Sequence, residues 1–530
     1  MPGGRSRAAA VVAVGVVLAG VVSCSGRAAA PSHSPSRPVA SPLVVSIANG
    51  KIRGKRVGDV DEYLGIPYAA PPVGPLRWKP TQPLPGGWDG IRAATKFGPH
   101  CPQPKGVFGH PSTSEDCLYL NVFAPAGHRA VGMPVMVWIH GGALVAGESN
   151  DYNPSGLVKD GAIVVTINYR LGALGFLADS AFASRRGGPA GDYGLMDQQA
   201  ALRWVQRNIG AFSGNQRNVT VFGESAGGQS VLMQLASPGA HGLFARAIAE
   251  SGGYALPPVP LAKAEAAGRA FAAKIGCAGN TAACLRKVPV SKILADQSQT
   301  GASADIDGLV LKEPLKTAFT SGKFNHVPVI DGSNHDEWRL FVALAVFEGH
   351  PVTAANYRSR IASTLRVSAA IAKVIAKQYP LKRYPSPALA LSALGTDAIF
   401  SCPTLKLDQE MSKYVPIYGY EFNDEHAPAP YPSPGFPYGA THASELQYLF
   451  TLPNSTPGQM SLSQRGLASL MKQEWTGFAK TGVPSASGVP AWPGFNGASQ
   501  SMLSLIPPKP KPETNFSAEH HCGFWALGGD

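Results

Sequence analysis

The chain has 530 residues and a formal net charge of +12 at pH 7. Hydrophobic residues make up 44% of it and charged residues 15%, a balance that allows a large core and excludes a coiled coil, a collagen-like chain and an acidic disordered tail. Glycine and proline together make up about a fifth of the residues, which is below the roughly 25–30% typical of low-complexity disorder. Lysine and arginine are dispersed along the sequence and no nucleic-acid-binding motif is present, so nucleic acid is not an expected partner.

The first 23 residues predict an export signal. Arg5 and Arg7 precede an uncharged apolar run at residues 8–22, which suits a signal peptide and is too short to span a bilayer comfortably. The run ends in the sequence VVSC, which resembles the lipobox of bacterial lipoproteins, where the cysteine becomes lipid-modified and N-terminal. We therefore expect Cys24 to anchor the mature protein at the outer face of the cell membrane; secretion is the alternative if Cys24 is not lipidated.

Residues 24–42 are rich in serine, proline and alanine and hold little to bury, so an extended tether is predicted there. Residues 43–530 contain no second linker, no internal repeat and no further apolar run of membrane length. One large catalytic domain without a spanning helix is expected.

Short β-rich runs alternate with helical patterns along this domain. Several of the runs are apolar on both faces, as in a parallel sheet covered by helices, and the alternation predicts an α/β fold. The expected strands are residues 118–123, 134–139, 162–168, 219–222, 246–250, 328–331 and 416–422. The expected helices are residues 195–208, 226–235, 262–275, 367–378 and 463–480.

A glycine-rich sequence, His140-Gly141-Gly142-Ala143, follows the expected strand at 134–139. In hydrolases such a loop offers backbone N–H groups to the oxyanion of a tetrahedral intermediate. Small residues are needed there because a bulky side chain would block the substrate carbonyl. The motif is weak evidence alone and strong evidence when a nucleophile motif follows downstream.

That nucleophile motif is GESAG at residues 223–227, which fits G-x-S-x-G. The expected strand at 219–222 leads into it and the expected helix at 226–235 leads out. A sharp strand-to-helix turn exposes the serine hydroxyl, and flanking glycines remove Cβ clashes. Ser225 is the predicted nucleophile, and the alternative is a fortuitous glycine-rich turn.

A carboxylate and a histidine are expected later in the chain, because this motif occurs in the order serine, acid, histidine. Asp336 and Glu337 both follow the expected strand at 328–331, near the sheet edge where open α/β sheets build their sites. Spacing alone does not choose between them. His442 has small neighbours, as a loop-borne base would. The competing histidines are His335, His350, His426, His520 and His521.

Together these motifs resemble those of the type-B carboxylesterase/cholinesterase family, from about residue 44 to the C-terminus. The matching sequences are EDCLYLNV at 115–122, NYRLG at 168–172, DYGLMDQ at 192–198, FGESAGG at 222–228 and SNHDE at 333–337. The resemblance implies an α/β-hydrolase fold with large helical and loop insertions. It also implies hydrolysis of small-molecule carboxylic esters through an acyl-enzyme, with no metal or organic cofactor.

The resemblance further implies a role for each site residue. Ser225 would be the nucleophile, Glu337 the acid and His442 the base. The oxyanion N–H groups would come from Gly142, Ala143 and Ala226. Asp336 would then be a solvated or loop-capping residue.

Three departures from the family pattern bear on specificity. Ala143 stands where the family usually has a third glycine, which could narrow the acyl pocket or alter the alcohol preference. Trp338 replaces the glycine that usually follows the acid. The loop at 102–116 has no tryptophan, whereas cholinesterases carry one there to hold a quaternary ammonium by cation–π contact. A choline-ester specialist is therefore not expected.

Seven cysteines leave an odd one, which a lipidated Cys24 would account for. The other six allow fifteen pairings, and the resemblance implies three disulfides. They are Cys101–Cys117, Cys277–Cys284 and Cys402–Cys522. Disulfides suit an exported chain. A metal site formed by His520, His521 and Cys522 is the alternative.

Two other functions fit the same fold. One is a lipase-like hydrolase of long-chain acyl esters. The other is a non-catalytic cell-surface adhesion protein, which the retention of Ser225 and His442 disfavours. The sequence does not indicate an oligomeric state.

Overall fold

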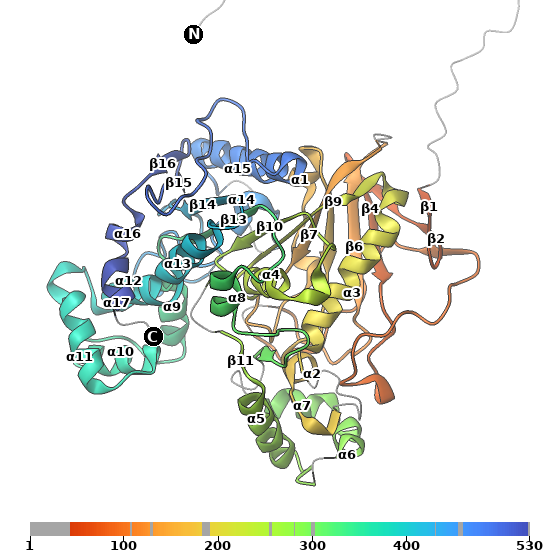
Figure 1. Cartoon of the computed structure of the whole chain (residues 1–530), viewed down its shortest axis with the longest axis horizontal. Helices are drawn as coiled ribbons and strands as arrows, with labels where there is room; N and C mark the ends of the chain where they lie inside the picture. The colour runs from red at the N-terminus through yellow and green to blue at the C-terminus, as the bar shows by residue number, and fades with distance from the viewer. Residues whose placement is uncertain are drawn as a thin grey trace, which may run out of the picture. The chain divides into compact units, whose positions relative to one another are not determined.

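The central sheet of this computed structural model has eleven strands within the described residues, which are 43–106, 109–127, 131–182, 191–253, 257–279, 281–297, 303–429, 431–453 and 459–527 (Figure 1). In order across the sheet they are β16 (Lys511–Glu513), β15 (Met502–Leu505), β14 (Ile417–Phe422), β13 (Val329–Asn334), β10 (Arg246–Glu250), β9 (Gly214–Glu224), β7 (Met133–Ile139), β8 (Ile163–Ile167), β6 (Tyr119–Pro125), β4 (Val60–Pro67) and β3 (Lys55–Val57). The strands from β15 to β8 are parallel, and the pairs at either end are antiparallel. The predicted mostly parallel sheet is confirmed.

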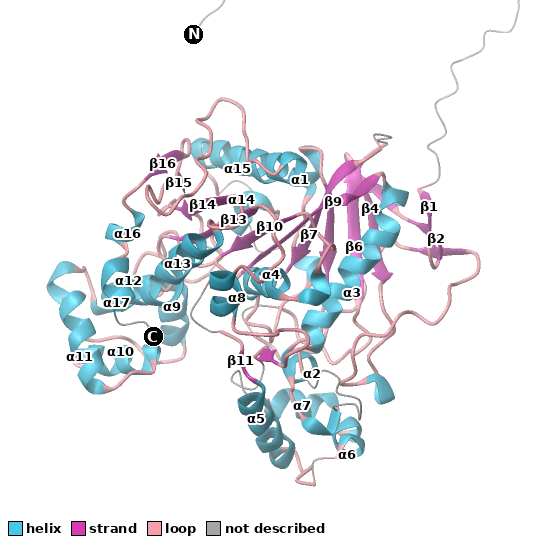
Figure 2. Ribbon diagram, in the orientation of Figure 1, coloured by secondary structure: helices cyan, strands magenta, loops and turns pink. Residues whose placement is uncertain are grey.

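Smaller elements complete the described part of the chain (Figure 2). Two minor sheets contain β1 (Val44–Ile47), β2 (Gly50–Arg53) and β5 (Ile91–Ala93), and β11 (Val259–Pro260) and β12 (Asp305–Ile306). The helices before β13 are α1 (Ser155–Lys159), α2 (Gly172–Phe176), α3 (Tyr193–Asn208), α4 (Ala226–Ala236), α5 (Leu261–Lys274), α6 (Ala282–Lys287), α7 (Val290–Asp296) and α8 (Leu315–Ser321). The helices after β13 are α9 (Arg339–Phe347), α10 (Tyr357–Leu365), α11 (Ala369–Gln378), α12 (Pro387–Gly395), α13 (Cys402–Met411), α14 (Leu446–Leu449), α15 (Leu462–Thr481), α16 (Phe516–Glu519) and α17 (Cys522–Leu527).

Side-chain alternation along the strands produces two cores, one on each face of the sheet. Val137 of β7 and Val221 of β9 point into a core that includes Trp204 of α3 and Val231 of α4. The intervening Trp138 and Phe222 point into the other core, where the apolar face of α15 and Leu157 of α1 pack. Figure 1 shows α15 and α1 on one side of the sheet and α3 and α4 on the other. Both faces are therefore covered, which explains why the strands are apolar throughout.

Two helical insertions carry cores of their own. Helices α5–α7 lie between β10 and β13 and pack with Trp78 and Leu174. Helices α9–α12 follow β13 and enclose residues such as Tyr357 and Leu391. Because these insertions leave the sheet just after β10 and β13, they bring side chains to the carboxyl edge of those strands.

One helical stretch in the described residues, Pro387–Met411, is long and apolar enough to cross a membrane by length and composition. This corrects the expectation that the domain has no apolar run of membrane length. It consists of α12, a π-helix at Thr396–Ser401 and α13. Of the 18 consecutive residues that make up its most apolar part, 78% are buried inside the protein, as in the core helix of a globular domain. Asp397 and Asp408, both buried, interrupt the apolar residues and obscured the run in the sequence.

All seven expected strands and all five expected helices are present with small differences at their ends. The largest difference is β9, which begins at Gly214 and not at 219, because polar residues open the strand. The five strands of the two minor sheets were not predicted, and neither were β3, β4, β15 and β16 of the central sheet. The last four lie towards the edges of the sheet, and β4 carries charged residues and a glycine that hide its pattern. The predicted signal at 1–23, the tether at 24–42 and Cys24 lie outside the described residues.

Three disulfides are present in the described chain, and they join Cys101 to Cys117, Cys277 to Cys284, and Cys402 to Cys522. These are the pairs that the family resemblance implies. Since the sulfur of Cys522 is bonded to Cys402, it is not free to join His520 and His521 as a metal ligand, and that alternative is wrong.

Candidate active site

Ser225 lies at the sharp turn between β9 and α4. Its backbone dihedrals, φ 55° and ψ −121°, are unusual for a residue with a side chain. A Cβ on Gly227 would come 2.0 Å from the carbonyl oxygen of Ile139, and one on Gly223 would come 2.5 Å from the same atom. Both glycines are therefore required by the close packing of the turn against β7. The turn is further held by Ser225 N–H, which donates to the carbonyl of Glu250 at 2.8 Å.

The side chains of Ser225, His442 and Glu337 form one hydrogen-bonded line. Ser225 Oγ lies 2.8 Å from His442 Nε2, and His442 Nδ1 lies 2.5 Å from Glu337 Oε2. The imidazole is 5% exposed and the carboxylate is fully buried, whereas Ser225 is half-buried. This order places a base beside the hydroxyl and a carboxylate behind the base, which is the arrangement that activates a serine.

Glu337 is fixed by donors from two neighbouring strand ends. Ser251 Oγ donates to Glu337 Oε1 at 2.5 Å, and the backbone N–H of Asn334 donates to the same oxygen at 2.8 Å. Glu337 Oε2 is thereby left to face His442. Ser251 and Asn334 were missed by sequence reasoning, although Ser251 directly follows an expected strand, at the edge where α/β sheets place functional groups.

Asp336, the alternative acid, is buried and bonded to a neighbouring loop, which fits the loop-capping role and not the solvated one. It is 6% exposed, and its Oδ2 accepts the backbone N–H of Ala440 at 3.1 Å. Its Oδ1 pairs with Arg339 Nη2 at 2.7 Å. Asp336 N–H also donates to the carbonyl of Ala440 at 3.0 Å. Asp336 therefore braces the turn that carries Glu337 against the loop that carries His442.

The loop His140–Ala143 approaches Ser225 from the end of β7. A Cβ on Gly141 would come 3.2 Å from Ser225 Cβ, so the loop backbone passes directly beside the serine. Gly142 has φ 99°, and a Cβ there would come 2.2 Å from the carbonyl oxygen of Ala146. Ala143 has φ 55°, a left-handed conformation that favours the glycine usual at this position in the family. The alanine therefore carries backbone strain.

The base of this loop is rigid. The ring of His140 stacks on Tyr169 with centroids 4.5 Å apart, and Tyr169 Oη donates to the carbonyl of His140 at 2.7 Å. Complete burial lowers the pKa of His140 to about 4, so the ring is neutral near pH 7. His140 is thus a packing residue that orients the backbone N–H groups and does not exchange protons there.

Glu224, the residue before the serine, adds a second carboxylate beside the imidazole. Its Oε1 lies 3.3 Å from His442 Nε2, and burial raises the pKa of Glu224 to about 7. Burial lowers the pKa of His442, but the negative charges of Glu224 and Glu337 outweigh that effect and raise it above its ordinary value. The two carboxylates would therefore stabilise a protonated imidazole at His442.

Two aromatic rings lie against His442, and a third packs on them. The rings of Phe341 and Phe400 lie 5.2 Å and 5.1 Å from the imidazole, and Trp338 stacks on Phe341 at 4.4 Å. Phe400 comes from the π-helix, a local distortion that often marks functional positions. Trp338, the residue that departs from the family glycine, thus contributes an aromatic wall near the reacting groups.

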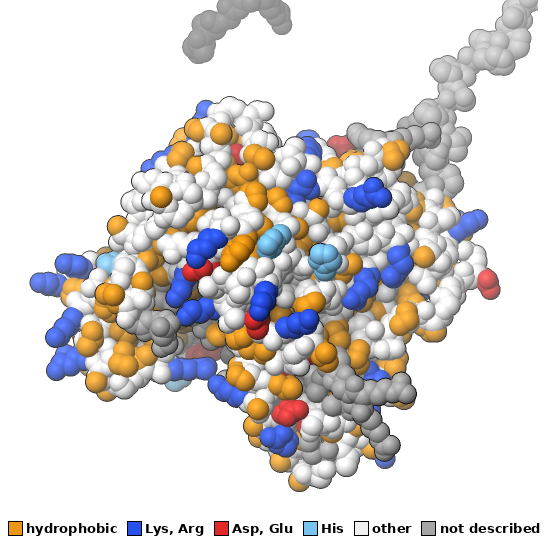
Figure 3. Space-filling view, viewed as in Figure 1, with side chains coloured by type: hydrophobic (Ala, Val, Ile, Leu, Met, Phe, Trp, Pro, Cys, Tyr) orange, Lys and Arg blue, Asp and Glu red, His pale blue; other side chains and the backbone are white. Residues whose placement is uncertain are grey.

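The competing histidines lie elsewhere. His335, His520 and His521 contact a separate group of carboxylates, and His350 and His426 are exposed. Two groups of described residues could hold a metal ion, His335–Glu421–His520 and His110–Glu148–Asp151, and neither contains Ser225, His442 or Glu337. Lys and Arg are dispersed over the face drawn in Figure 3 and do not gather in a stripe.

The sequence model described as the carboxylesterase family matches residues 41–525, which is most of the chain. The chain belongs to the carboxylesterase family. Its fold is the α/β-hydrolase fold, and it is a type-B carboxylesterase that hydrolyses small-molecule esters.

Curated relatives of this carboxylesterase match it along nearly their whole length. Para-nitrobenzyl esterase of Bacillus subtilis is 35% identical over 489 residues, covering 87% of this chain and 94% of the relative. Fumonisin B1 esterase of Sphingopyxis macrogoltabida is 34% identical over 482 residues, covering 87% and 86%. Cocaine esterase of Homo sapiens is 32% identical over 486 residues, covering 86% and 85%. These relatives are named for chemically different esters, so they agree on the reaction class and not on one substrate.

Proposed function

We propose that this carboxylesterase cleaves its esters with Ser225 as nucleophile, His442 as base and Glu337 as orienting acid. The proposal rests on two hydrogen-bond distances. Ser225 Oγ lies 2.8 Å from His442 Nε2, and His442 Nδ1 lies 2.5 Å from Glu337 Oε2. His442 takes the hydroxyl proton as Oγ attacks the ester carbonyl, and then returns it to the departing alkoxide. Water activated by His442 attacks the acyl-enzyme, which releases the carboxylic acid and restores Ser225.

The oxyanion of each tetrahedral intermediate is placed between the loop after β7 and the start of α4. Backbone N–H groups of Gly142, Ala143 and Ala226 are the proposed donors. The close approach of Gly141 to Ser225 supports this placement, and the N-terminus of α4 adds a favourable field. Since these donors are backbone atoms of rigid turns, they need little reorganisation as negative charge develops.

We further propose that the preferred substrates of this enzyme carry a compact apolar or aromatic group on one side of the ester. The partly exposed rings of Phe341, which lies against His442, and Trp338, which stacks on Phe341, offer such a group an aromatic surface. The relatives named for para-nitrobenzyl esters and for cocaine act on esters with aromatic parts, which supports the same class here.

Esterase assays with a serine variant test the proposal. Wild-type protein should hydrolyse p-nitrophenyl esters and react covalently with a fluorophosphonate, and Ser225→Ala should lose both while circular dichroism stays unchanged. Labelling that persists in Ser225→Ala would place the nucleophile elsewhere. Ser230→Ala, on the same helix and hydrogen-bonded to the carbonyl of Ala226, is the matched control and should keep the label.

We also propose that the mature protein is lipid-anchored through Cys24. The apolar run at 8–22 followed by VVSC supports export and lipidation. Wild-type protein should partition into the detergent phase, and Cys24→Ser should be released or remain unprocessed. A wholly soluble wild-type protein with an N-terminus other than residue 24 would refute the anchor and leave the esterase proposal intact.

A further inference from the structure

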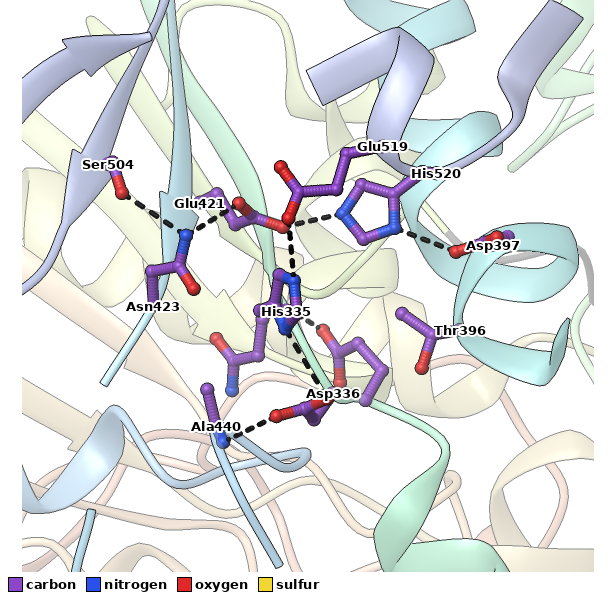
Figure 4. Close-up of polar contacts among 12 residues, drawn as sticks. His335, Asp336, Thr396, Asp397, Glu421, Asn423, Ala440, Ser504, Glu519 and His520 are labelled. Atoms are coloured by element: carbon purple, nitrogen blue, oxygen red, sulfur yellow. Dashed lines mark hydrogen bonds and ion pairs between the residues drawn. The ribbon is translucent and has the colours of Figure 1, made fainter. Parts of the chain in front are cut away.

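A second cluster of chemically reactive side chains lies on the far side of the turn that carries Glu337. Figure 4 shows the side chains of His335, Glu421, Glu519 and His520 converging on one point. They come from three parts of the chain, namely the turn after β13, strand β14 and the end of helix α16, where Glu519 and His520 are adjacent. Ligand atoms of His335, Glu421 and His520 all lie within 4.8 Å of one another.

The facing atoms have the spacing of a compact ligand set. His520 Nε2 lies 2.6 Å from Glu421 Oε1, and His335 Nε2 lies 3.2 Å from Glu519 Oε1. Ligands at about 2.0–2.2 Å from a tetrahedral zinc ion are roughly 3.3 Å apart. The separation between His335 and Glu519 is close to this value, and the hydrogen-bonded pair His520–Glu421 would have to open by about 0.7 Å to admit the ion.

Each histidine also has a carboxylate behind its ring. His520 Nδ1 lies 2.7 Å from Asp397 Oδ1, and His335 Nδ1 lies 3.3 Å from Asp336 Oδ1. In metal sites the second ring nitrogen of a ligating histidine is almost always held by a carboxylate, a carbonyl or water, which fixes the ring and its tautomer. The ring of His520 is therefore oriented with Nε2 facing Glu421, whereas His335 Nδ1 has an ion-pair contact with Asp336 but no hydrogen bond.

From this arrangement we propose a structural site for a divalent transition metal, Zn²⁺ first, with His335, His520, Glu421 and Glu519 as ligands. Two imidazole nitrogens and two carboxylate oxygens in a compact set suit zinc better than calcium or magnesium, which take more oxygens. His520 and Glu421 are buried, while His335 and Glu519 are partly exposed and give the ion a route from solvent.

Protons are the competing occupants of the cluster. Both ring nitrogens of His520 already have carboxylate partners, Nε2 with Glu421 at 2.6 Å and Nδ1 with Asp397 at 2.7 Å. A metal ion at this point would take the place of the proton that His520 and Glu421 share.

The site would tie the C-terminal segment to the active-site turn. His335 is two residues before Glu337, and His520 is next to the disulfide-bonded Cys402–Cys522 pair. Glu421 is further held by Asn423, whose Nδ2 donates to Glu421 Oε2 at 3.0 Å. A bound ion would stabilise these contacts and raise the melting temperature, with no step of ester hydrolysis passing through it.

Metal titration of the full-length protein tests the proposal. The protein is first treated with EDTA and dialysed into metal-free buffer, then mixed with ZnCl₂ and desalted to remove unbound metal. It should retain about one Zn²⁺ per chain, and its melting temperature should be higher than that of the metal-free protein. CoCl₂ should give the visible absorption of four-coordinate Co²⁺. Wild-type protein that retains no stoichiometric Zn²⁺ would overturn the site and leave the protonated cluster as the answer.

Variants separate this cluster from other ligands. His335→Gln, at the partly exposed side, should lose the retained Zn²⁺ and the Co²⁺ spectrum. Asp397→Asn should weaken Zn²⁺ binding about 10–100-fold, as expected for a carboxylate behind a ligand. His110→Gln, in the separate group His110–Glu148–Asp151, is the matched control and should retain the ion. Loss of Zn²⁺ in His110→Gln with retention in His335→Gln would overturn the assignment.

Discussion

Glu337→Gln is the sharpest test of the proposed acid, because the structure predicts which way the new amide must point. Glu337 Oε1 accepts two hydrogen bonds, from Ser251 Oγ and from Asn334 N–H. Glutamine can keep both only if its carbonyl oxygen takes that position. Its NH₂ group then faces His442 Nδ1, which must become an acceptor, so the ring proton moves to Nε2.

A proton on Nε2 prevents His442 from accepting the proton of Ser225. The negative charge that stabilises the imidazolium is lost as well. The worked serine-protease precedent for this change is a drop of about 10⁴ in kcat. We expect a loss of roughly 10³–10⁴ here, or about 4–5 kcal/mol of activation free energy. KM should change little, since Glu337 is buried behind the histidine.

Asp336→Asn is the matched control. Its carbonyl oxygen can still accept the N–H of Ala440, and what is lost is the ion pair with Arg339. We expect less than a tenfold loss in kcat and a small decrease in melting temperature. The assay is kcat for both variants on p-nitrophenyl acetate, with circular dichroism confirming the fold. A crippled Asp336→Asn beside an active Glu337→Gln would show that the assignment of the acid is wrong.

Three further predictions follow from the same site and its supports. Because the neutral imidazole of His442 is the proposed base, activity should rise with pH as His442 loses its proton at its raised pKa. Glu224→Gln removes one negative charge that raises this pKa, so the acid limb of kcat/KM should move to lower pH. A shift to higher pH would contradict this account. The double variant Cys402→Ser, Cys522→Ser removes a disulfide that joins residues 120 positions apart, so the free energy of unfolding should fall by about 3–5 kcal/mol. A lower melting temperature would show this, and an unchanged melting temperature would contradict it. Trp338→Ala should open the aromatic wall and raise kcat/KM for bulky acyl esters relative to acetate by about tenfold, whereas an unaltered chain-length profile would show that the wall does not limit the substrate.

Local chemistry made much of the site predictable from sequence. The glycines around Ser225 can be recognised because only residues without a Cβ fit where the turn packs against Ile139. The strands that precede the motifs are also local, since side chains buried on both faces give continuous apolar runs. The edge strands lacked this signal because they are short or carry polar residues, and β4 and β15 were missed for that reason.

The sequence could not choose between Asp336 and Glu337, because two adjacent residues beyond a strand differ by one position only. That difference does not tell which of the two side chains faces the histidine. The fold separates them: Glu337 faces His442, and Asp336 faces Ala440 and Arg339. Ser251 and Phe400 were invisible for a related reason. Their positions beside Glu337 and His442 depend on where β10 ends and how the π-helix turns.

The sequence by itself therefore determined the family and the reaction class and predicted the nucleophile, because the residues responsible lie within short motifs whose geometry is local. The tertiary structure decided which carboxylate serves the histidine and which aromatic rings surround it. It also assembled His335, Glu421, Glu519 and His520, which come from segments far apart in the chain, into one cluster. Contacts between distant segments depend on strand order and helix packing, and no spacing along the chain encodes them.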